Sequence, residues 1–219
     1  MARAENPAET FIDEEFPSRL RPFIPPALKR AYAAADRLME RTEWLDTPSG
    51  RFQRGDLIVK ATEFEFFKLI TAGSLPFEPS WDDYAQPTGK HLVMRTPRAR
   101  ITINQVPECD QRPRHAKFRE NFGAANTAYL WPEWNDEARR KNKLRHILLL
   151  HGYQTLSFAN LAFPHPRRRK LIHYTDNLLN LLHEVPSTAE GPAEEGPSES
   201  PDPETLEVLE RFIRDNHGD

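Results

Sequence analysis

The chain has little cysteine: Cys109 is the only one among 219 residues. This excludes an internal disulfide framework and a zinc site built from several thiolates. Strongly apolar runs are also short, as in Ile147–Leu150, whereas a membrane-spanning helix needs about 20 apolar residues. The N-terminal residues include acids and prolines where a secretion signal needs a basic start and an apolar stretch. These absences predict a cytoplasmic protein without a membrane segment.

Common catalytic motifs are missing too. There is no Gly-x-x-x-x-Gly-Lys loop, no Gly-x-Gly-x-x-Gly loop and no His-Glu-x-x-His zinc motif. The segment His146–Tyr153 resembles the strand and His-Gly turn that precede the oxyanion loop of α/β-hydrolases, but no Gly-x-Ser-x-Gly turn follows it, which excludes that family. His146 and His151 would point to opposite faces of a strand. We therefore expect no metal and no cofactor.

Charge is distributed unevenly along the chain. The whole chain has a net charge of −3, but residues 91–184 have a net charge of +8 and residues 185–219 a net charge of −8. Seven of the eight histidines also fall in 91–184. A concentrated basic surface attracts phosphate or carboxylate groups over about 8–10 Å. The pattern predicts a basic body attached to an acidic tail.

Helices are expected early in the chain. Residues 1–24 contain several prolines and acids and are expected to form an irregular arm, which precedes a single domain over 25–185. Apolar residues at three- and four-residue steps predict one helix from Pro25 to about Glu43 and another from Asp56 to Gly73. Residues 61–66 also fit a strand, because their apolar residues alternate.

Strands are expected later. After a loop at 74–89, strands are predicted at 90–95 and 98–106. The second alternates and has a solvent-exposed face that contains Arg100, Thr102 and Asn104. Further strands are expected near Tyr129, at 147–150, at 155–163 and at 171–175, with a short helix near 178–182. The predicted fold class is α+β, with N-terminal helices packed on an antiparallel-rich sheet.

The end of the chain has a different composition. Residues 186–203 are mostly Pro, Glu, Ser, Gly and Ala, which predicts a disordered acidic linker. Residues 204–217 then predict a C-terminal amphipathic helix with an apolar stripe of Leu206, Leu209, Phe212 and Ile213. This stripe is expected either to bind a protein partner or to dock on the chain's own body. The acidic tail could also fold over the basic body and compete with a polyanion.

The candidate binding residues form a predicted basic face. Arginine dominates it, which suits bidentate contacts to phosphate or carboxylate. Tyr129, Trp131 and Trp134 are candidates for stacking on bases. Some of the arginines could instead form internal ion pairs. The predicted face consists of Arg95, Arg98, Arg100, Arg112, Arg114, His115, Lys117, Arg119, Arg167, Arg168, Arg169 and Lys170.

Three functions fit this pattern. The first is a non-enzymatic binding or regulatory protein that contacts nucleic acid, or an acidic protein, through the basic face. The second is a regulator or inhibitor that binds a protein partner through the C-terminal helix. The third is a histidine-assisted phosphodiesterase or nuclease, with His115 as acid or base, or with Cys109 as nucleophile beside it. No second member of a catalytic dyad is identifiable, so a binding role is favoured and no catalytic residue is assigned.

Overall fold

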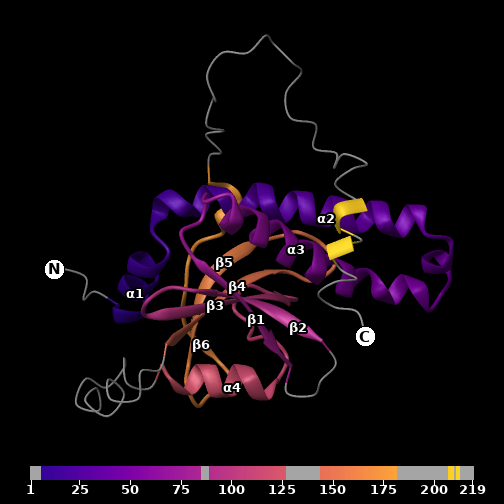
Figure 1. Cartoon of the computed structure of the whole chain (residues 1–219). Coiled ribbons are helices and arrows are strands. Elements are labelled where there is room, and N and C mark those ends of the chain that lie inside the picture. Colours follow the sequence, from indigo (N-terminus) through magenta and orange to yellow (C-terminus); the bar gives the residue numbers. More distant parts are fainter. Residues whose placement is uncertain (1–5, 85–88, 127–143, 182–206, 210, 213–219) are drawn as a thin grey trace, which may run out of the picture.

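A computed structural model of the chain describes residues 6–84, 89–126, 144–181, 207–209 and 211–212. In this part of the chain, six strands form one sheet that has helices on both faces (Figure 1). The predicted α+β class is therefore confirmed. The predicted linker at 186–203 and the strand expected near Tyr129 lie outside the described residues, as do Trp131 and Trp134.

The strands follow one another across the sheet in sequence order. Neighbouring strands are antiparallel except β3 and β4, which run parallel and place Ile101 beside Ile147. A parallel pair needs a crossover connection, and α4 lies within the connection between these two strands. The sheet is thus antiparallel-rich, as predicted. Its strands are β1 Glu78–Asp83, β2 Lys90–Arg95, β3 Ala99–Val106, β4 Arg145–Gly152, β5 Ala159–Pro164 and β6 Leu171–Tyr174.

The helices divide between the two faces of the sheet. Helices α1 (Pro7–Glu15), α2 (Ile24–Arg41) and α3 (Arg54–Thr71) belong to the layer on one face, and α4 (Lys117–Ala124) lies on the other side (Figure 1). Short 3-10 helices connect them: η1 (Ser18–Phe23) before α2, then η2 (Glu43–Asp46) and η3 (Gly50–Gln53) before α3. Another, η5 (Leu178–Asn180), follows β6.

The main core lies between the sheet and the three-helix layer. Alternate residues of the central strands, including Ile101, Leu149 and Leu161, are fully buried against apolar side chains of the helices, such as Leu28 and Phe66. Burying side chains of this size stabilises the fold by about 1.5–3 kcal/mol each. The alternation that predicted the strands therefore marks the helix-facing side of the sheet.

Helix α1 corrects the expected irregular arm at 1–24. Asn6 accepts a hydrogen bond from the Ala8 backbone N–H (3.1 Å) and caps the helix, and Pro7 occupies the first turn, where a missing N–H costs nothing. Phe11 and Phe16 are fully buried in the main core. Pro7, which suggested an irregular segment, therefore lies in the first turn of a helix.

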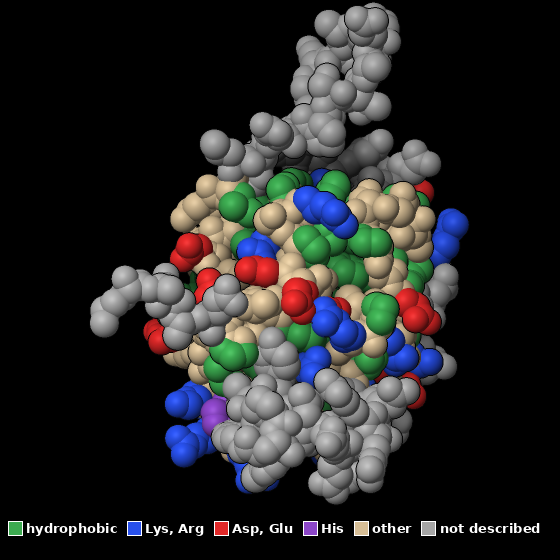
Figure 2. Space-filling view, turned by 90° about the vertical axis from the view of Figure 1, so that its left-hand side faces the viewer, with side chains coloured by type: hydrophobic (Ala, Val, Ile, Leu, Met, Phe, Trp, Pro, Cys, Tyr) green, Lys and Arg blue, Asp and Glu red, His purple; other side chains and the backbone are tan. Residues whose placement is uncertain are grey.

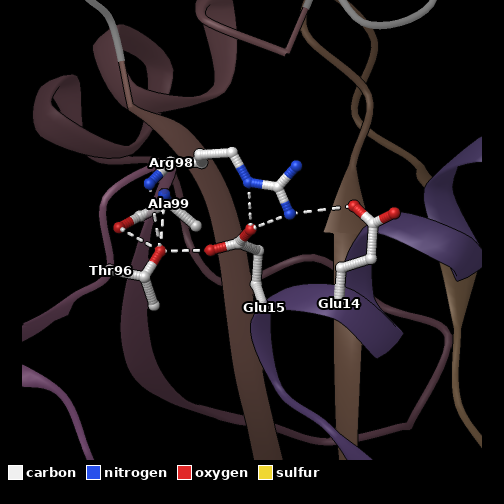
Figure 3. A network of polar contacts seen from close by, with 5 residues as sticks. All are labelled: Glu14, Glu15, Thr96, Arg98 and Ala99. Carbon is white, nitrogen blue, oxygen red and sulfur yellow. Dashed lines mark hydrogen bonds and ion pairs between the residues drawn. The ribbon is translucent and has the colours of Figure 1, made fainter.

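A polar network ties α1 to the turn between β2 and β3 (Figure 3). The Arg98 guanidinium contacts Glu15 with its Nε (2.6 Å) and Glu14 with a terminal nitrogen (2.9 Å). The Thr96 hydroxyl donates to the other oxygen of Glu15. The Ala99 backbone N–H donates to the same hydroxyl (2.8 Å), so one carboxylate fixes both the turn and its arginine.

The two predicted long helices are confirmed as α2 and α3. Helix α3 is followed by Gly73 in a left-handed conformation (φ 75°), as expected for a glycine at a helix end. The alternative strand at 61–66 is wrong, because these residues belong to α3. Their side chains are all buried, including those of Glu63 and Glu65. Strand β1 is a further correction, because it occupies part of the loop expected at 74–89.

The C-terminal segment contacts the helical layer. Residues 207–209 and 211–212 are helical, and Leu209 is almost fully buried against α2 and α3. The Phe212 ring lies 4.8 Å from the Phe64 ring and 5.4 Å from the Trp81 ring, centroid to centroid. For these two residues the structure shows docking on the chain's own body. Leu206 and Ile213 lie outside the described residues, and binding of a separate partner by this stripe stays a prediction.

Candidate functional site

Arg112 joins two basic segments that are far apart in the sequence. Its guanidinium donates to the backbone carbonyls of His165 (3.2 Å) and Arg168 (2.7 Å). The segment before α4 is thereby held against the loop between β5 and β6. We call the result the joined basic surface, and it consists of Arg112, Arg114, Lys117, Arg119, Arg167, Arg168, Arg169 and Lys170.

The loop between β5 and β6 is ordered by its own histidine. The backbone N–H groups of Arg167 and Arg168 both donate to Nδ1 of His165, at 3.0 Å each. Burial lowers the pKa of His165, and the charges of Arg168 and Lys170 lower it further. A neutral ring is what an Nδ1 acceptor requires. The loop therefore turns four consecutive cationic side chains, 167–170, toward solvent, where all four are exposed.

Arg119 is held in place by the sheet. Its Nε donates to Oδ1 of Asn104 (2.8 Å), and a terminal nitrogen donates to the backbone carbonyl of Arg114 (2.7 Å). Asn104 is itself fixed, because its amide nitrogen donates to the carbonyl and the hydroxyl of Thr102, at 3.0 Å each. This chain of contacts orients the arginine before any ligand binds.

The chain of contacts continues into the centre of the sheet. The Thr102 hydroxyl lies 2.8 Å from Nε2 of His146, which is fully buried on β4. The Asn126 side chain accepts a hydrogen bond from the backbone N–H of His146 (2.8 Å) and donates one to the His146 carbonyl (3.1 Å). Burial lowers the pKa of His146 well below its ordinary value, and the nearby charges of Arg100 and Arg119 act in the same direction. Burial and the neighbouring cations therefore favour the neutral form of His146.

This polar row corrects one expectation. Thr102 and Asn104 were predicted to lie on a solvent-exposed face, but their exposed fractions are 2% and 4%. Helix α4 covers that face, with the Phe122 ring under the Arg100 guanidinium (4.1 Å). His146 lies on this side of the sheet, whereas His151 bonds to Tyr32 of α2 (2.8 Å), so the prediction that the two histidines face opposite ways is confirmed.

The joined basic surface contains a small pocket of about 40 Å³. It lies where the residues before α4 meet Arg169 of the β5–β6 loop. Burial lowers the pKa of Arg112, and the Arg169 charge lowers it further; burial likewise lowers the pKa of Arg119, with a contribution from Arg112. The guanidinium groups thus repel one another. The pocket is lined by Arg112, Pro113, Arg114, His115, Ala116, Arg119, Glu120, Leu148 and Arg169.

Other members of the predicted basic face are placed elsewhere. Arg95 pairs with Asp82 (3.0 Å), and Arg98 belongs to the network with Glu14 and Glu15 (Figure 3). These two arginines are internal ion-pair partners, the alternative that the sequence left open. Arg100 is half-buried against Phe122. Figure 2 shows the contrast: Lys and Arg side chains gather around a histidine at the lower edge, while cations and acids mix on the upper part of the same face.

The structure describes the surroundings of both catalytic candidates, His115 and Cys109. His115 is exposed, and its Nε2 lies 2.7 Å from the Glu120 carboxylate. Cys109 packs against an apolar cluster that includes Val106 and Phe158. In the part of the chain that the structure describes, no group of three or more His, Cys, Asp or Glu side chains converges as metal ligands would. No helix there is both long enough and apolar enough to cross a membrane.

Comparisons with protein-family models, with curated proteins and with solved structures find no match for this chain. The contact that organises the site, from Arg112 to the 165–170 loop, has no sequence signal, because it links residues more than 50 positions apart. The sequence does contain a weak signal for helix α4. Phe118 and Phe122 are four residues apart, the spacing that places two aromatic rings on one face of a helix.

Proposed function

We propose that the protein binds nucleic acid through the phosphate backbone, at the joined basic surface. The observation that supports this most is the pair of hydrogen bonds from Arg112 to the carbonyls of His165 and Arg168, since it brings eight Lys and Arg side chains onto one surface. Only three acids, Glu108, Asp110 and Glu120, occur in 107–120 and 165–170. One of these, Glu120, is already engaged by His115.

The chemistry of the surface suits phosphate. A guanidinium presents a planar set of donors that matches two phosphate oxygens, and six of the eight cations are arginine. Exposed cations that neutralise phosphates displace condensed counterions, which supplies most of the affinity for a nucleic acid backbone. This contact does not depend on base sequence. We therefore expect the protein to bind different sequences with similar affinity.

The test compares two double charge reversals of equal size. R168E/R169E removes two exposed cations of the surface, and R19E/K29E removes two exposed cations of the helical layer. We expect the first variant to weaken binding of a labelled oligonucleotide by about 10–100-fold in fluorescence anisotropy, because each reversal removes a phosphate contact and adds repulsion. The second variant should stay within about threefold of the wild type, as expected for cations that make no phosphate contact.

Equal loss in both variants would mean that only net charge matters, and it would contradict the proposed surface. Absence of binding by the wild type at low salt would contradict nucleic acid binding itself. In that case an acidic protein would be the remaining ligand class for this surface. Circular dichroism of each variant checks that the fold is intact.

A further inference from the structure

The small pocket differs from the rest of the joined basic surface, because several arginines line one concavity and two of them, Arg112 and Arg119, are partly buried. Four arginine residues line it, Arg112, Arg114, Arg119 and Arg169, and Leu148 forms part of its wall. Two of these guanidinium groups are held in place by the protein: Arg112 by two backbone carbonyls, and Arg119 by Asn104 and a further carbonyl. A ligand here meets an array of donors that is already ordered, so little side-chain entropy is lost on binding.

The pocket size restricts the ligand. The pocket is small, with a volume of about 40 Å³. A pocket of this size suits a single small anionic group at the end of a ligand. A phosphodiester inside a strand has a sugar on both sides and cannot enter such a space fully. A terminal phosphate has three free oxygens and only one ester link.

Charge points to the same ligand. The Glu120 carboxylate is the one acid among the lining residues, and it contacts His115. Four arginines thus share the pocket lining with a single carboxylate. The backbone around the first turn of α4 adds to this: Ala116 makes no side-chain cap, and it lines the pocket. Amide groups at a helix start favour an anion.

We infer that this pocket binds the terminal phosphate monoester of a nucleic acid strand, with Arg119 as the central contact and Asn104 as its positioning residue. This inference rests on the proposed nucleic acid binding. It adds a preference for phosphorylated ends that the open surface alone would not produce.

The experiment measures anisotropy with one labelled oligonucleotide in three forms: with a 5′-phosphate, with a 3′-phosphate and with hydroxyl ends. For the wild type, we expect one phosphorylated form to bind about tenfold more tightly than the hydroxyl form, the effect of an added charge-assisted contact. Inorganic phosphate at millimolar concentration should abolish this preference and leave binding of the hydroxyl form nearly unchanged.

Two matched variants separate the pocket from the surface. R119A and R168A each remove one arginine, but only Arg119 lines the pocket. R119A should abolish the preference for the phosphorylated end, whereas R168A should weaken binding of all three forms and keep the preference. R114A, which changes an exposed lining residue, gives a second test should R119A fail to fold.

The outcomes distinguish the two proposals. Equal binding of phosphorylated and hydroxyl ends by the wild type would overturn the pocket and leave the surface intact. A preference that survives in both R119A and R114A would also overturn it, since the phosphate would then be bound elsewhere. No binding of any form would reject both proposals together.

Discussion

Glu63 offers the sharpest test of how this fold balances burial against charge. Its side chain on α3 is 3% exposed, and its Oε1 accepts the Leu92 backbone N–H of β2 (3.1 Å). Burial raises the pKa of Glu63 to about 8, although the Leu92 hydrogen bond and the Lys60 charge oppose the shift. We predict that Glu63→Gln, which mimics the protonated acid, stabilises the protein at pH 8 and has little effect at pH 5.

The sign follows from proton uptake. Between pH 4.5 and about 8 the unfolded chain has released this proton while the folded chain keeps it, so the free energy of unfolding falls as the pH rises. The full shift corresponds to an upper limit of about 5 kcal/mol, at about 1.4 kcal/mol per pKa unit. Local hydration of a buried carboxylate reduces this cost, and we expect a gain of roughly 2–3 kcal/mol for the variant at pH 8.

Urea unfolding of wild type and variant at pH 5 and pH 8 measures this difference. Glu65→Gln is the matched control, since Glu65 is equally buried but pairs with Arg30 (2.8 Å) and Lys68 (2.6 Å). Losing those two ion pairs should destabilise the control at pH 8 by about 1 kcal/mol, because both cations are partly exposed. A Glu63→Gln protein that is no more stable than wild type at pH 8 would refute the reasoning.

Two further predictions concern the same fold. Burial lowers the pKa of His91 to about 4, so on acidification the unfolded chain binds a proton before the folded chain does, and stability is lost as the pH falls from 6.5 toward 4. In urea unfolding at pH 7 and pH 4.5, His91→Gln should lose about 1–2 kcal/mol less stability than wild type on acidification. Equal losses would contradict this. Phe212→Ala should lower the free energy of unfolding by about 1–3 kcal/mol, because contact with Phe64 and Trp81 is lost. Val208→Ala changes a side chain with an exposed fraction of 45% and should lower it by less than about 0.5 kcal/mol. Similar losses in the two variants would argue against docking of the C-terminal segment.

Sequence patterns predicted the elements whose burial is regular. Helix α2 and strand β3 bury residues at their own period, and β4 contains a continuous buried apolar run, so the apolar residues of the sequence mark these elements directly. Helix α1 was missed because Pro7 and Pro17 suggested an irregular segment, although a proline in the first turn is compatible with a helix. Strand β1 was missed because Pro79 weakened the strand pattern on what is an edge strand.

The candidate site was predictable only in part. The density of arginine in 112–119 and 167–170 is visible in the sequence, but the contact from Arg112 to the loop depends on the tertiary fold. The same holds for the support of Arg119 by Asn104, since α4 must first cover that face of the sheet. Arg95 and Arg98 have the same chemistry as the surface arginines, and only their positions beside Asp82 and Glu15 assign them a structural role.

The salt dependence of oligonucleotide binding tests the central claim most directly. If the joined basic surface neutralises about five phosphates, a plot of the logarithm of the association constant against the logarithm of the salt concentration has a slope of about −4 to −5. R168E/R169E should lower the magnitude of that slope by about 2, and R19E/K29E should leave it unchanged. A wild-type slope near zero, or the same slope in R168E/R169E as in wild type, would contradict phosphate binding at this surface.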